Sequence, residues 1–286
     1  MLKGRVGENP LTIKLRQGML PHMWCPGCGI GVIVSAFLRA LGDSELSQDK
    51  TSVVCGVGCT GRAGGYVDLD AFHTTHGRAI PFATGLKLAN PELQVVVFGG
   101  DGDIAAIGGN HLLHAAQRNM DLLVVCVNNF NYGMTGGQVS PTTPIGATLT
   151  TVPYGSFTAT INMPLLADAC GASYVARWTT YHLRQMERTF REALSKKGFR
   201  FIEVISPCPE LYERRNRLGD GVDRMRFYKN NSVVQNGADT RDLEIGFDSQ
   251  IVVGIFVDRE RETYSEAMDR RLTESLGSKY VPVGQG

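Results

Sequence analysis

Short apolar runs alternate with longer amphipathic segments from about residue 30 to residue 205. Buried β-strands are predicted from the strongly apolar runs at 52–57, 93–98, 122–127, 173–177 and 200–205. Helices are predicted from the segments at 30–41, 79–89, 104–118, 164–170 and 180–197. Strands that alternate with helices in this way predict an α/β fold with a doubly wound, mostly parallel sheet.

The less regular segments set the predicted domain organisation. Residues 1–22 carry few structural signals and are predicted to form an N-terminal arm. Residues 23–210 hold the alternating elements and form the predicted main domain. Residues 211–286 are a charged extension, predicted to pack on this domain or on a partner, with a possible edge strand at 251–256. Residues 139–160, rich in Thr, Pro and Gly, suggest a mobile loop over a site.

Composition narrows the class of protein. The 286 residues are 43% hydrophobic, which is enough for a large α/β core. The net charge is +1 and the 29 basic residues form no stripe, which argues against nucleic-acid binding. The sequence has no apolar run of membrane-spanning length and no signal-peptide pattern, so we expect a cytoplasmic protein that does not associate with a membrane. Its seven cysteines then favour metal ligands or core thiols over disulfides.

Polar residues follow two of the predicted strands. Gly99-Gly100-Asp101-Gly102-Asp103 follows the run at 93–98, and Asn128-Asn129 follows the run at 122–127. Ligands of open α/β sheets bind beyond the carboxyl ends of the strands, where an Asp and an Asn can share one hard cation. The glycines let a diphosphate approach the backbone. The pattern predicts Mg²⁺ and a diphosphate cofactor on Asp101 and Asn129; two ordinary turns, with Asp101 as a helix N-cap, are the alternative.

The loop after Asn129 extends this predicted site. The backbone carbonyl of Asn131 is the predicted third metal ligand, with diphosphate and water oxygens completing an octahedron. The loop Tyr132-Gly133-Met134-Thr135-Gly136-Gly137 would bring backbone N–H groups and a hydroxyl to the phosphates.

Four cysteines lie where thiols can gather at the same edge. Cys25 and Cys28 form a Cys-x-x-Cys turn, while Cys59 and Cys208 each follow a predicted strand. Four thiolates suit either a tetrahedral zinc ion or a [4Fe–4S] cluster, and the residues alone leave both open, with a disulfide or unliganded thiols as a minority interpretation. The remaining cysteines are predicted to be core residues: Cys55, Cys126 and Cys170.

Two basic side chains are further candidates. Arg62 follows Cys59 by three residues in a glycine-rich turn, and Arg is suited to binding a carboxylate. A surface salt bridge is an equally good interpretation of Arg62. His76, in Thr75-His76-Gly77-Arg78, is either a phosphate or substrate contact or a structural histidine.

These motifs together resemble the β subunit of the 2-oxoacid:ferredoxin oxidoreductases, which depend on thiamine diphosphate. They run in the family's order across about residues 22–210, and the resemblance rests on Trp24-Cys25-Pro26-Gly27-Cys28-Gly29, Gly56-Val57-Gly58-Cys59, His76-Gly77-Arg78-Ala79, Gly100-Asp101-Gly102-Asp103, Asn128-Asn129, Tyr132 through Gln138, and Ser206-Pro207-Cys208.

The resemblance implies a set of site residues. It places one [4Fe–4S] cluster on Cys25, Cys28, Cys59 and Cys208, and Mg²⁺ on Asp101, Asn129 and Asn131. It implies catalytic roles for Cys59, Arg62 and His76, with Arg62 as the candidate for the substrate carboxylate. The implied thiamine diphosphate contacts are Gly58, Cys59, His76, Gly100, Asp101, Gly102, Asp103, Asn129, Tyr132, Gly133, Met134 and Thr135.

The resemblance also implies a reaction and partners. A 2-oxoacid would be decarboxylated oxidatively with coenzyme A, and the electrons would pass through the cluster to ferredoxin. The segment 208–219 looks like the 2-oxoglutarate branch, with pyruvate and branched-chain oxoacids as alternatives. The pyrimidine-binding domain and its catalytic Glu would belong to an α subunit, in an (αβ)₂ assembly. Two competing hypotheses are a non-redox thiamine diphosphate decarboxylase subunit with structural zinc and a non-catalytic zinc-binding scaffold.

Overall fold

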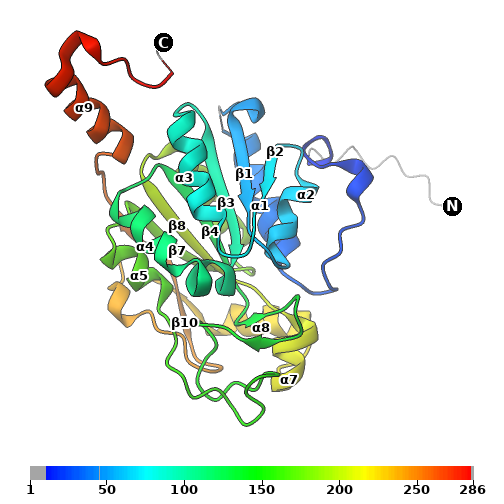
Figure 1. Ribbon diagram of the computed structural model, residues 1–286. Helices are drawn as coiled ribbons and strands as arrows, with labels where there is room; N and C mark the ends of the chain where they lie inside the picture. Colours follow the sequence, from blue (N-terminus) through cyan, green and yellow to red (C-terminus); the bar gives the residue numbers. More distant parts are fainter. Residues whose placement is uncertain (1–10, 45, 285–286) are drawn as a thin grey trace.

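The structure is a computed structural model that describes residues 11–44 and 46–284 (Figure 1). Eight strands of these residues form one sheet in the order β2-β1-β3-β4-β8-β7-β10-β9. Neighbouring strands are parallel except β10, which runs antiparallel to β7. The predicted α/β fold with a mostly parallel sheet is confirmed. The strands are β1 (Thr51–Cys55), β2 (Asp70–His73), β3 (Gln94–Gly100), β4 (Leu122–Asn128), β7 (Tyr174–Thr179), β8 (Phe199–Ile205), β9 (Ser232–Val234) and β10 (Ile251–Asp258).

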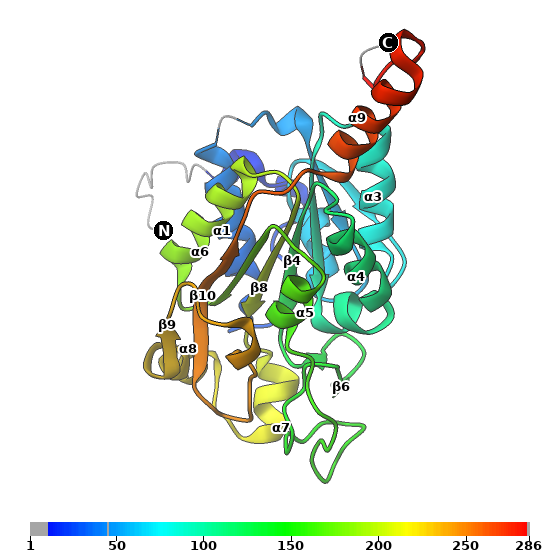
Figure 2. The same cartoon turned by 90° about the vertical axis from the view of Figure 1, so that its left-hand side faces the viewer.

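Helices cover both faces of the sheet (Figure 2). One face carries α1 (Ile30–Gly42) and α6 (Leu183–Ser195). The other carries α3 (Ala79–Ala89), α4 (Gly109–Gln117) and α5 (Met163–Ala169). The short helix α2 (Ala63–Tyr66) follows β1, and a separate hairpin is formed by β5 (Asn131–Tyr132) and β6 (Gln138–Val139).

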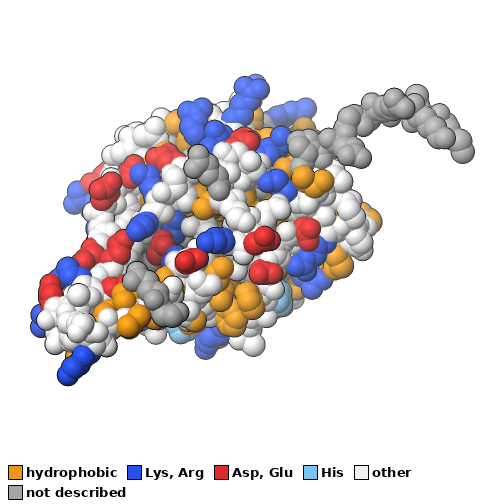
Figure 3. Space-filling model, turned by 90° about the horizontal axis from the view of Figure 1, so that it is seen from above, with side chains coloured by type: hydrophobic (Ala, Val, Ile, Leu, Met, Phe, Trp, Pro, Cys, Tyr) orange, Lys and Arg blue, Asp and Glu red, His pale blue; other side chains and the backbone are white. Residues whose placement is uncertain are grey.

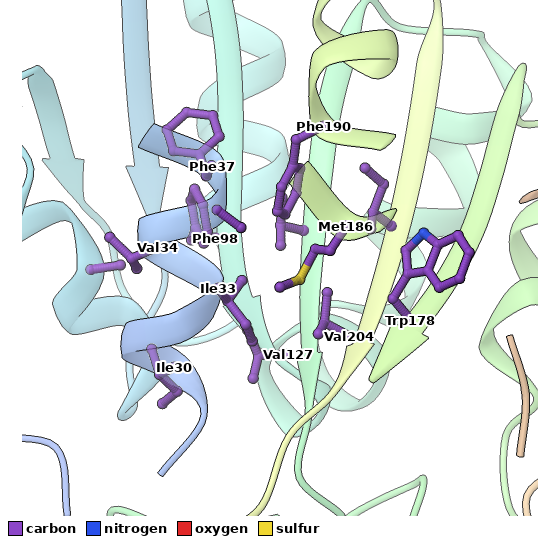
Figure 4. Close-up of a cluster of buried hydrophobic side chains, with 14 of the residues drawn as sticks. Ile30, Ile33, Val34, Phe37, Phe98, Val127, Trp178, Met186, Phe190 and Val204 are labelled. Atoms are coloured by element: carbon purple, nitrogen blue, oxygen red, sulfur yellow. The ribbon is translucent and has the colours of Figure 1, made fainter. Parts of the chain in front are cut away.

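The continuous apolar runs arise because the central strands are buried on both faces. In β3, Val96 and Phe98 pack in the core beneath α1 and α6, whereas Val95 and Val97 pack in the core on the opposite face. Figure 4 shows the first of these cores, where Phe37 of α1 lies edge-on to Phe98, with ring centroids 5.2 Å apart. Strands covered on both faces hold their carboxyl ends in a rigid row.

The C-terminal extension contributes to the main sheet. Strand β10 was predicted to be an edge strand, but this is wrong because β9 pairs along its outer side. Two further helices, α7 (Arg214–Asn216) and α8 (Gly221–Asn231), lie before β9, and α9 (Tyr264–Leu276) projects away from the sheet (Figures 1 and 2). The apolar pattern did not predict α8 and α9, which begin instead at capping boxes of Asp220 with Asp223 and of Thr263 with Glu266.

Four further observations bear on the sequence predictions. The predicted helix at 104–118 begins as a π-helical turn (Gly102–Ile107) before α4. Residues 1–10 of the predicted N-terminal arm lie outside the described residues, and the rest of the arm contains two short 3₁₀ turns. No helix of the described chain is long and apolar enough to cross a membrane. On the face seen in Figure 3, acidic and basic side chains are interspersed.

Candidate active site

Three oxygen atoms converge just beyond the ends of β3 and β4. Asp101 and Asn129 directly follow these strands, and both are buried. The side-chain oxygen of Asn129 lies 3.2 Å from Asp101 Oδ1 and 2.7 Å from the backbone oxygen of Asn131. Oxygens that face one another without a hydrogen between them repel. The arrangement therefore needs a cation among them, or else the Asn129 amide turns over and donates to both.

The spacing of these oxygens fits magnesium. Mg²⁺ holds its ligands at about 2.0–2.1 Å in an octahedron, so adjacent ligand oxygens lie about 2.9 Å apart. The two distances at Asn129, 3.2 and 2.7 Å, lie on either side of that value, and they are equally the distances of two hydrogen bonds donated by a turned-over amide. One carboxylate, one amide and one backbone carbonyl are also the hard oxygen donors that Mg²⁺ prefers.

Two hydroxyl groups hold the other oxygen of Asp101. Ser140 Oγ and Thr142 Oγ1 lie 2.5 and 2.7 Å from Asp101 Oδ2, so Oδ1 is left to face Asn129. Burial raises the pKa of Asp101 to about 6, and the two hydroxyls lower it in part. Sequence reasoning missed Ser140 and Thr142, whose signal was the hydroxyl-rich Ser140-Pro141-Thr142-Thr143 at the start of the predicted mobile loop. This part of the loop is buried.

A cavity of about 280 Å³ adjoins the three oxygens. It brings together most of the residues that the sequence indicated for the cofactor, and two others, Val57 and Thr60. The predicted residues in its lining are Gly58, Cys59, His76, Gly100, Asp101, Gly102, Asp103, Asn129, Asn131, Tyr132, Gly133, Met134 and Thr135. Arg62 is not among them and lines a separate hollow with Arg16 and His73.

Close packing explains one of the cavity glycines. A Cβ atom at Gly102 would lie 2.2 Å from the Tyr132 ring, so only glycine lets the ring lie against the backbone at the start of the π-helical turn. The Tyr132 hydroxyl lies 3.3 Å from the Gly102 carbonyl oxygen and donates to it. The turn after β3 and the loop after β4 therefore form the two walls of one cradle.

Asp103 holds the imidazole of His76 at the cavity wall. Asp103 Oδ1 accepts from the Gly77 N–H at 2.7 Å and lies 2.8 Å from His76 Nδ1. Since His76 Nδ1 also faces the carbonyl oxygen of Val57, at 3.3 Å, this nitrogen carries the proton. In the neutral ring, Nε2 is then a hydrogen-bond acceptor. Burial raises the pKa of Asp103 above its usual value, and the Gly77 N–H and His76 lower it in part.

Two of the candidate cysteines, Cys59 and Cys208, lie beside this cavity, and Cys28 and Cys25 are their neighbours. The Cβ position of Gly133, a cavity residue, lies 3.5 Å from Cys208 Sγ and 3.7 Å from Cys59 Sγ. Burial raises the pKa of the Cys28 thiol to about 12, with smaller contributions from the neighbouring Cys208, Cys59 and Cys25. Burial also raises the pKa of Cys208 to about 11.

The thiols are neighbours but are not arranged around a point. Within residues 11–44 and 46–284, no group of three His, Cys, Asp or Glu side chains could hold a single metal ion. The Cys-x-x-Cys turn is tied to the Cys59 turn by Trp24, whose Nε1 donates to the Cys59 carbonyl at 2.8 Å. Sequence reasoning did not assign this role to Trp24. Cys55 and Cys126, predicted to be core residues, are fully buried, and Cys170 is partly buried.

Comparison with known proteins identifies the family. Residues 56–204 match the model for the thiamine pyrophosphate enzyme C-terminal TPP-binding domain. The chain is 48% identical over 272 residues to the 2-oxoglutarate synthase subunit KorB of Methanocaldococcus jannaschii, covering 95% of this chain and 100% of that protein. It is 46% identical to the subunit of the same name from Methanothermobacter marburgensis, covering 95% of each.

A similar solved structure comes from the same family. The 2-oxoglutarate:ferredoxin oxidoreductase of Magnetococcus marinus, determined with 2-oxoglutarate, coenzyme A and succinyl-CoA bound, matches with a TM-score of 0.82 and 29% identity. The match covers 96% of this chain and 92% of that one. The fold, the strand-end site and these relatives together show that the chain belongs to the β subunits of the 2-oxoglutarate:ferredoxin oxidoreductases, within the thiamine pyrophosphate enzyme family.

Proposed function

We propose that this chain, together with an α subunit, converts 2-oxoglutarate and coenzyme A into succinyl-CoA and CO₂ and passes two electrons, one at a time, to ferredoxin. The substrate and the acyl acceptor follow from the names of the relatives and from the molecules bound in the Magnetococcus marinus enzyme. The observation that carries the proposal is that the Asn129 side chain meets the Asp101 carboxylate and the Asn131 carbonyl oxygen at the ends of β3 and β4, next to a glycine-lined cavity.

In this proposal, Asp101 Oδ1, the Asn129 side-chain oxygen and the Asn131 backbone oxygen hold Mg²⁺, and the glycine-rich cradle accepts the diphosphate of thiamine diphosphate. The bound cofactor supplies the electron sink that decarboxylation of a 2-oxoacid requires. His76, oriented by Asp103, presents Nε2 as a proton acceptor at the cavity wall. Cys59 lines the same cavity and would place the electron acceptor beside the reaction.

We assign one [4Fe–4S] cluster to Cys25, Cys28, Cys59 and Cys208. A single zinc ion draws its four sulfurs to about 2.3 Å from one point, whereas a cubane cluster binds each thiolate through a different iron and spreads them farther apart. The choice of the cluster follows from the chemistry of the family: the relatives are named for electron transfer to ferredoxin, and zinc cannot carry electrons. Because iron–sulfur ligands are thiolates, binding must overcome the burial that raises the pKa of Cys28 and Cys208.

The cavity also supports a shared active site. Small-molecule sites enclose about 300–1,000 Å³. The cavity of about 280 Å³ is at the lower end of that range, and the matched family model is only the C-terminal TPP-binding domain, so this chain would supply one side of the cofactor site. The pyrimidine end would be held by the α subunit, which would also supply the catalytic Glu, and we propose an (αβ)₂ assembly. Arg62 keeps its proposed role toward the substrate carboxylate only if the α subunit extends the site to the hollow that Arg62 lines.

The test is anaerobic co-purification of the chain with its α subunit, followed by iron, sulfide, zinc and thiamine analysis. We expect four irons and one thiamine diphosphate per αβ unit, and 2-oxoglutarate-dependent reduction of ferredoxin that requires coenzyme A. Pyruvate and a branched-chain oxoacid serve as comparison substrates. Zinc without iron, or decarboxylation without ferredoxin reduction, would contradict the proposal.

A further inference from the structure

A buried chain of hydrogen bonds runs from the converging oxygens into the sheet, and Asn128 is its centre. Asn128 is the last residue of β4 and is 2% exposed. Its Nδ2 donates to Glu203 Oε1 of the neighbouring strand β8 at 2.7 Å. Its Oδ1 lies 3.1 Å from the Phe130 N–H and 2.9 Å from the Thr142 hydroxyl, and accepts from both.

One of these contacts shapes the turn that carries two of the converging oxygens. The bond from the Phe130 N–H closes a turn around Asn129, and Phe130 adopts a left-handed backbone with φ of 62°. Such a conformation is costly for an aromatic residue and needs support from its surroundings. The turn places the Asn129 side chain between Asp101 and the Asn131 carbonyl oxygen.

The other contact reaches Asp101. The Thr142 hydroxyl lies 2.7 Å from Asp101 Oδ2 and 2.9 Å from Asn128 Oδ1, so its single proton is shared between the two oxygens. Asn128 therefore touches both halves of the oxygen cluster, one through Thr142 and the other through the turn after β4.

A buried ion pair fixes Asn128 itself. Glu203 Oε2 accepts from Arg177 Nε of β7 at 2.6 Å, and Arg177 also donates to the Leu243 carbonyl at 2.7 Å. Both charged residues are 1% exposed. Since one Glu203 oxygen is held by Arg177, the other is left to accept from Asn128. An amide is required at position 128, because the side chain must donate at one end and accept at the other.

We propose that Asn128 is a positioning residue for magnesium-dependent binding of thiamine diphosphate, clamping the Asp101 and Asn129 sides of the metal site at a fixed separation. This inference rests on the proposed function, which places Mg²⁺ among the three oxygens. Residues behind metal ligands commonly change metal affinity by 10–100-fold when they are replaced, because they orient the ligands.

The experiment uses the αβ complex, stripped of cofactor with a chelator under anaerobic conditions. Thiamine diphosphate binding is followed by calorimetry while Mg²⁺ is varied, and the thermal midpoint and iron content of each variant report on folding. We expect Asn128→Asp to raise the half-saturating Mg²⁺ concentration by roughly tenfold or more, because two carboxylates then face each other across 2.7 Å.

The double variant Asn128→Asp with Glu203→Gln is the decisive control. Its amide at position 203 donates to the carboxylate at position 128 and accepts from Arg177, so the buried charges and the number of hydrogen bonds are restored with one bond reversed. In the single variant Glu203→Gln, the new amide lies between two donors, Asn128 and Arg177, and can accept from only one of them through its oxygen. This variant should therefore also need more Mg²⁺. If the double variant returns the half-saturating Mg²⁺ concentration toward that of the unaltered protein, the clamp is supported. If the double variant weakens Mg²⁺ binding by at least the sum of the two single losses in binding free energy, the clamp is overturned.

Two conservative substitutions at Thr142 test the same hydrogen-bond network if the Asn128→Asp variant does not fold. Thr142→Val removes the hydroxyl with little change in shape, and Thr142→Ser keeps the hydroxyl. We expect only the valine variant to need more Mg²⁺, and equal behaviour of the two overturns the inference. Asp101→Asn separates this from a failure of the proposed function. If Asp101→Asn leaves magnesium-dependent binding unchanged, the metal assignment fails; if it abolishes binding while Thr142→Val and Asn128→Asp have no effect, only the clamp fails.

Discussion

Replacing Gly56 with alanine should dislodge the carboxylate of Asp103. Gly56 directly follows β1, and its N–H donates to the Phe98 carbonyl, so its backbone is tied to the sheet. An added Cβ would lie 1.8 Å from Asp103 Oδ2. Non-bonded heavy atoms approach to about 3.5 Å, so the carboxylate would have to move by roughly 1.7 Å.

The cost follows from the bonds that this movement breaks. Asp103 Oδ1 accepts from the Gly77 N–H at 2.7 Å and contacts His76 Nδ1 at 2.8 Å. Hydrogen bonds to charged groups contribute about 1.5–3 kcal/mol each. Loss of both bonds should lower the free energy of unfolding by about 3 kcal/mol or more. In a domain of 150–250 residues that would lower the thermal midpoint by ~6–12 °C, and in the larger αβ complex by a few degrees. It also frees the His76 ring, so kcat should fall as well.

The assay is thermal unfolding of the cofactor-free αβ complex followed by circular dichroism, with ferredoxin reduction measured in parallel. Gly85→Ala is the matched control, because nothing lies within 4 Å of a Cβ at this position in α3. It should gain about 0.5–1 kcal/mol, as alanine does in a helix interior. In an Asp103→Ala background, Gly56→Ala should cost little. An unchanged midpoint, or an equal cost in both backgrounds, would refute the reasoning.

Three further predictions concern other parts of the chain. The pKa of Glu266 is lowered from 4.5 to about 2, chiefly by a hydrogen bond from Lys197. The contribution of the Glu266 carboxylate to the free energy of unfolding is therefore present above pH ~4.5 and is lost as the pH falls toward 2. In urea unfolding, Glu266→Gln should lower the free energy of unfolding by under ~1 kcal/mol at pH 7 and leave it unchanged near pH 2. Cys208→Ser should lower the iron content, while Cys170→Ser should not, as elemental analysis would show. Trp24→Phe removes the bond to the Cys59 carbonyl and should speed the release of iron to a chelator; an unchanged rate would contradict this role.

Much of the fold could be predicted because its signals are local. Central strands covered on both faces must be apolar at consecutive positions, so β3, β4 and β8 stand out in the sequence. The capped helices α8 and α9 carry many charged residues, and α8 reaches the core mainly through Tyr228 while α9 has no buried residue, so the apolar pattern could not reveal them. The order of strands past β7 depends on pairing between distant segments, which is why the edge position of β10 was mistaken.

The candidate site divides in the same way. Asp101 and Asn129 could be selected from the sequence, because parallel strands must end side by side and the residues that follow them meet there. The hydroxyl groups that hold the Asp101 carboxylate could not be selected from the sequence. Ser140 and Thr142 are 39 and 41 residues from Asp101 in the chain and reach it only through the folding of the loop after β6. Arg62 shows the converse, since its nearness to Cys59 in sequence does not bring it to the cavity.

By itself, the sequence determined the α/β class, the family resemblance and the residue types at the strand ends, because each depends on short-range pattern and spacing. Only the tertiary structure decided that the Asn129 side chain meets Asp101 and the Asn131 carbonyl oxygen, that Cys59 and Cys208 lie beside the same cavity, and that Asn128 is fixed by Glu203 and Arg177. The physical reason is that a buried polar atom must find its partner wherever the fold brings one, and hydrogen bonds between distant segments leave no periodic trace in the chain.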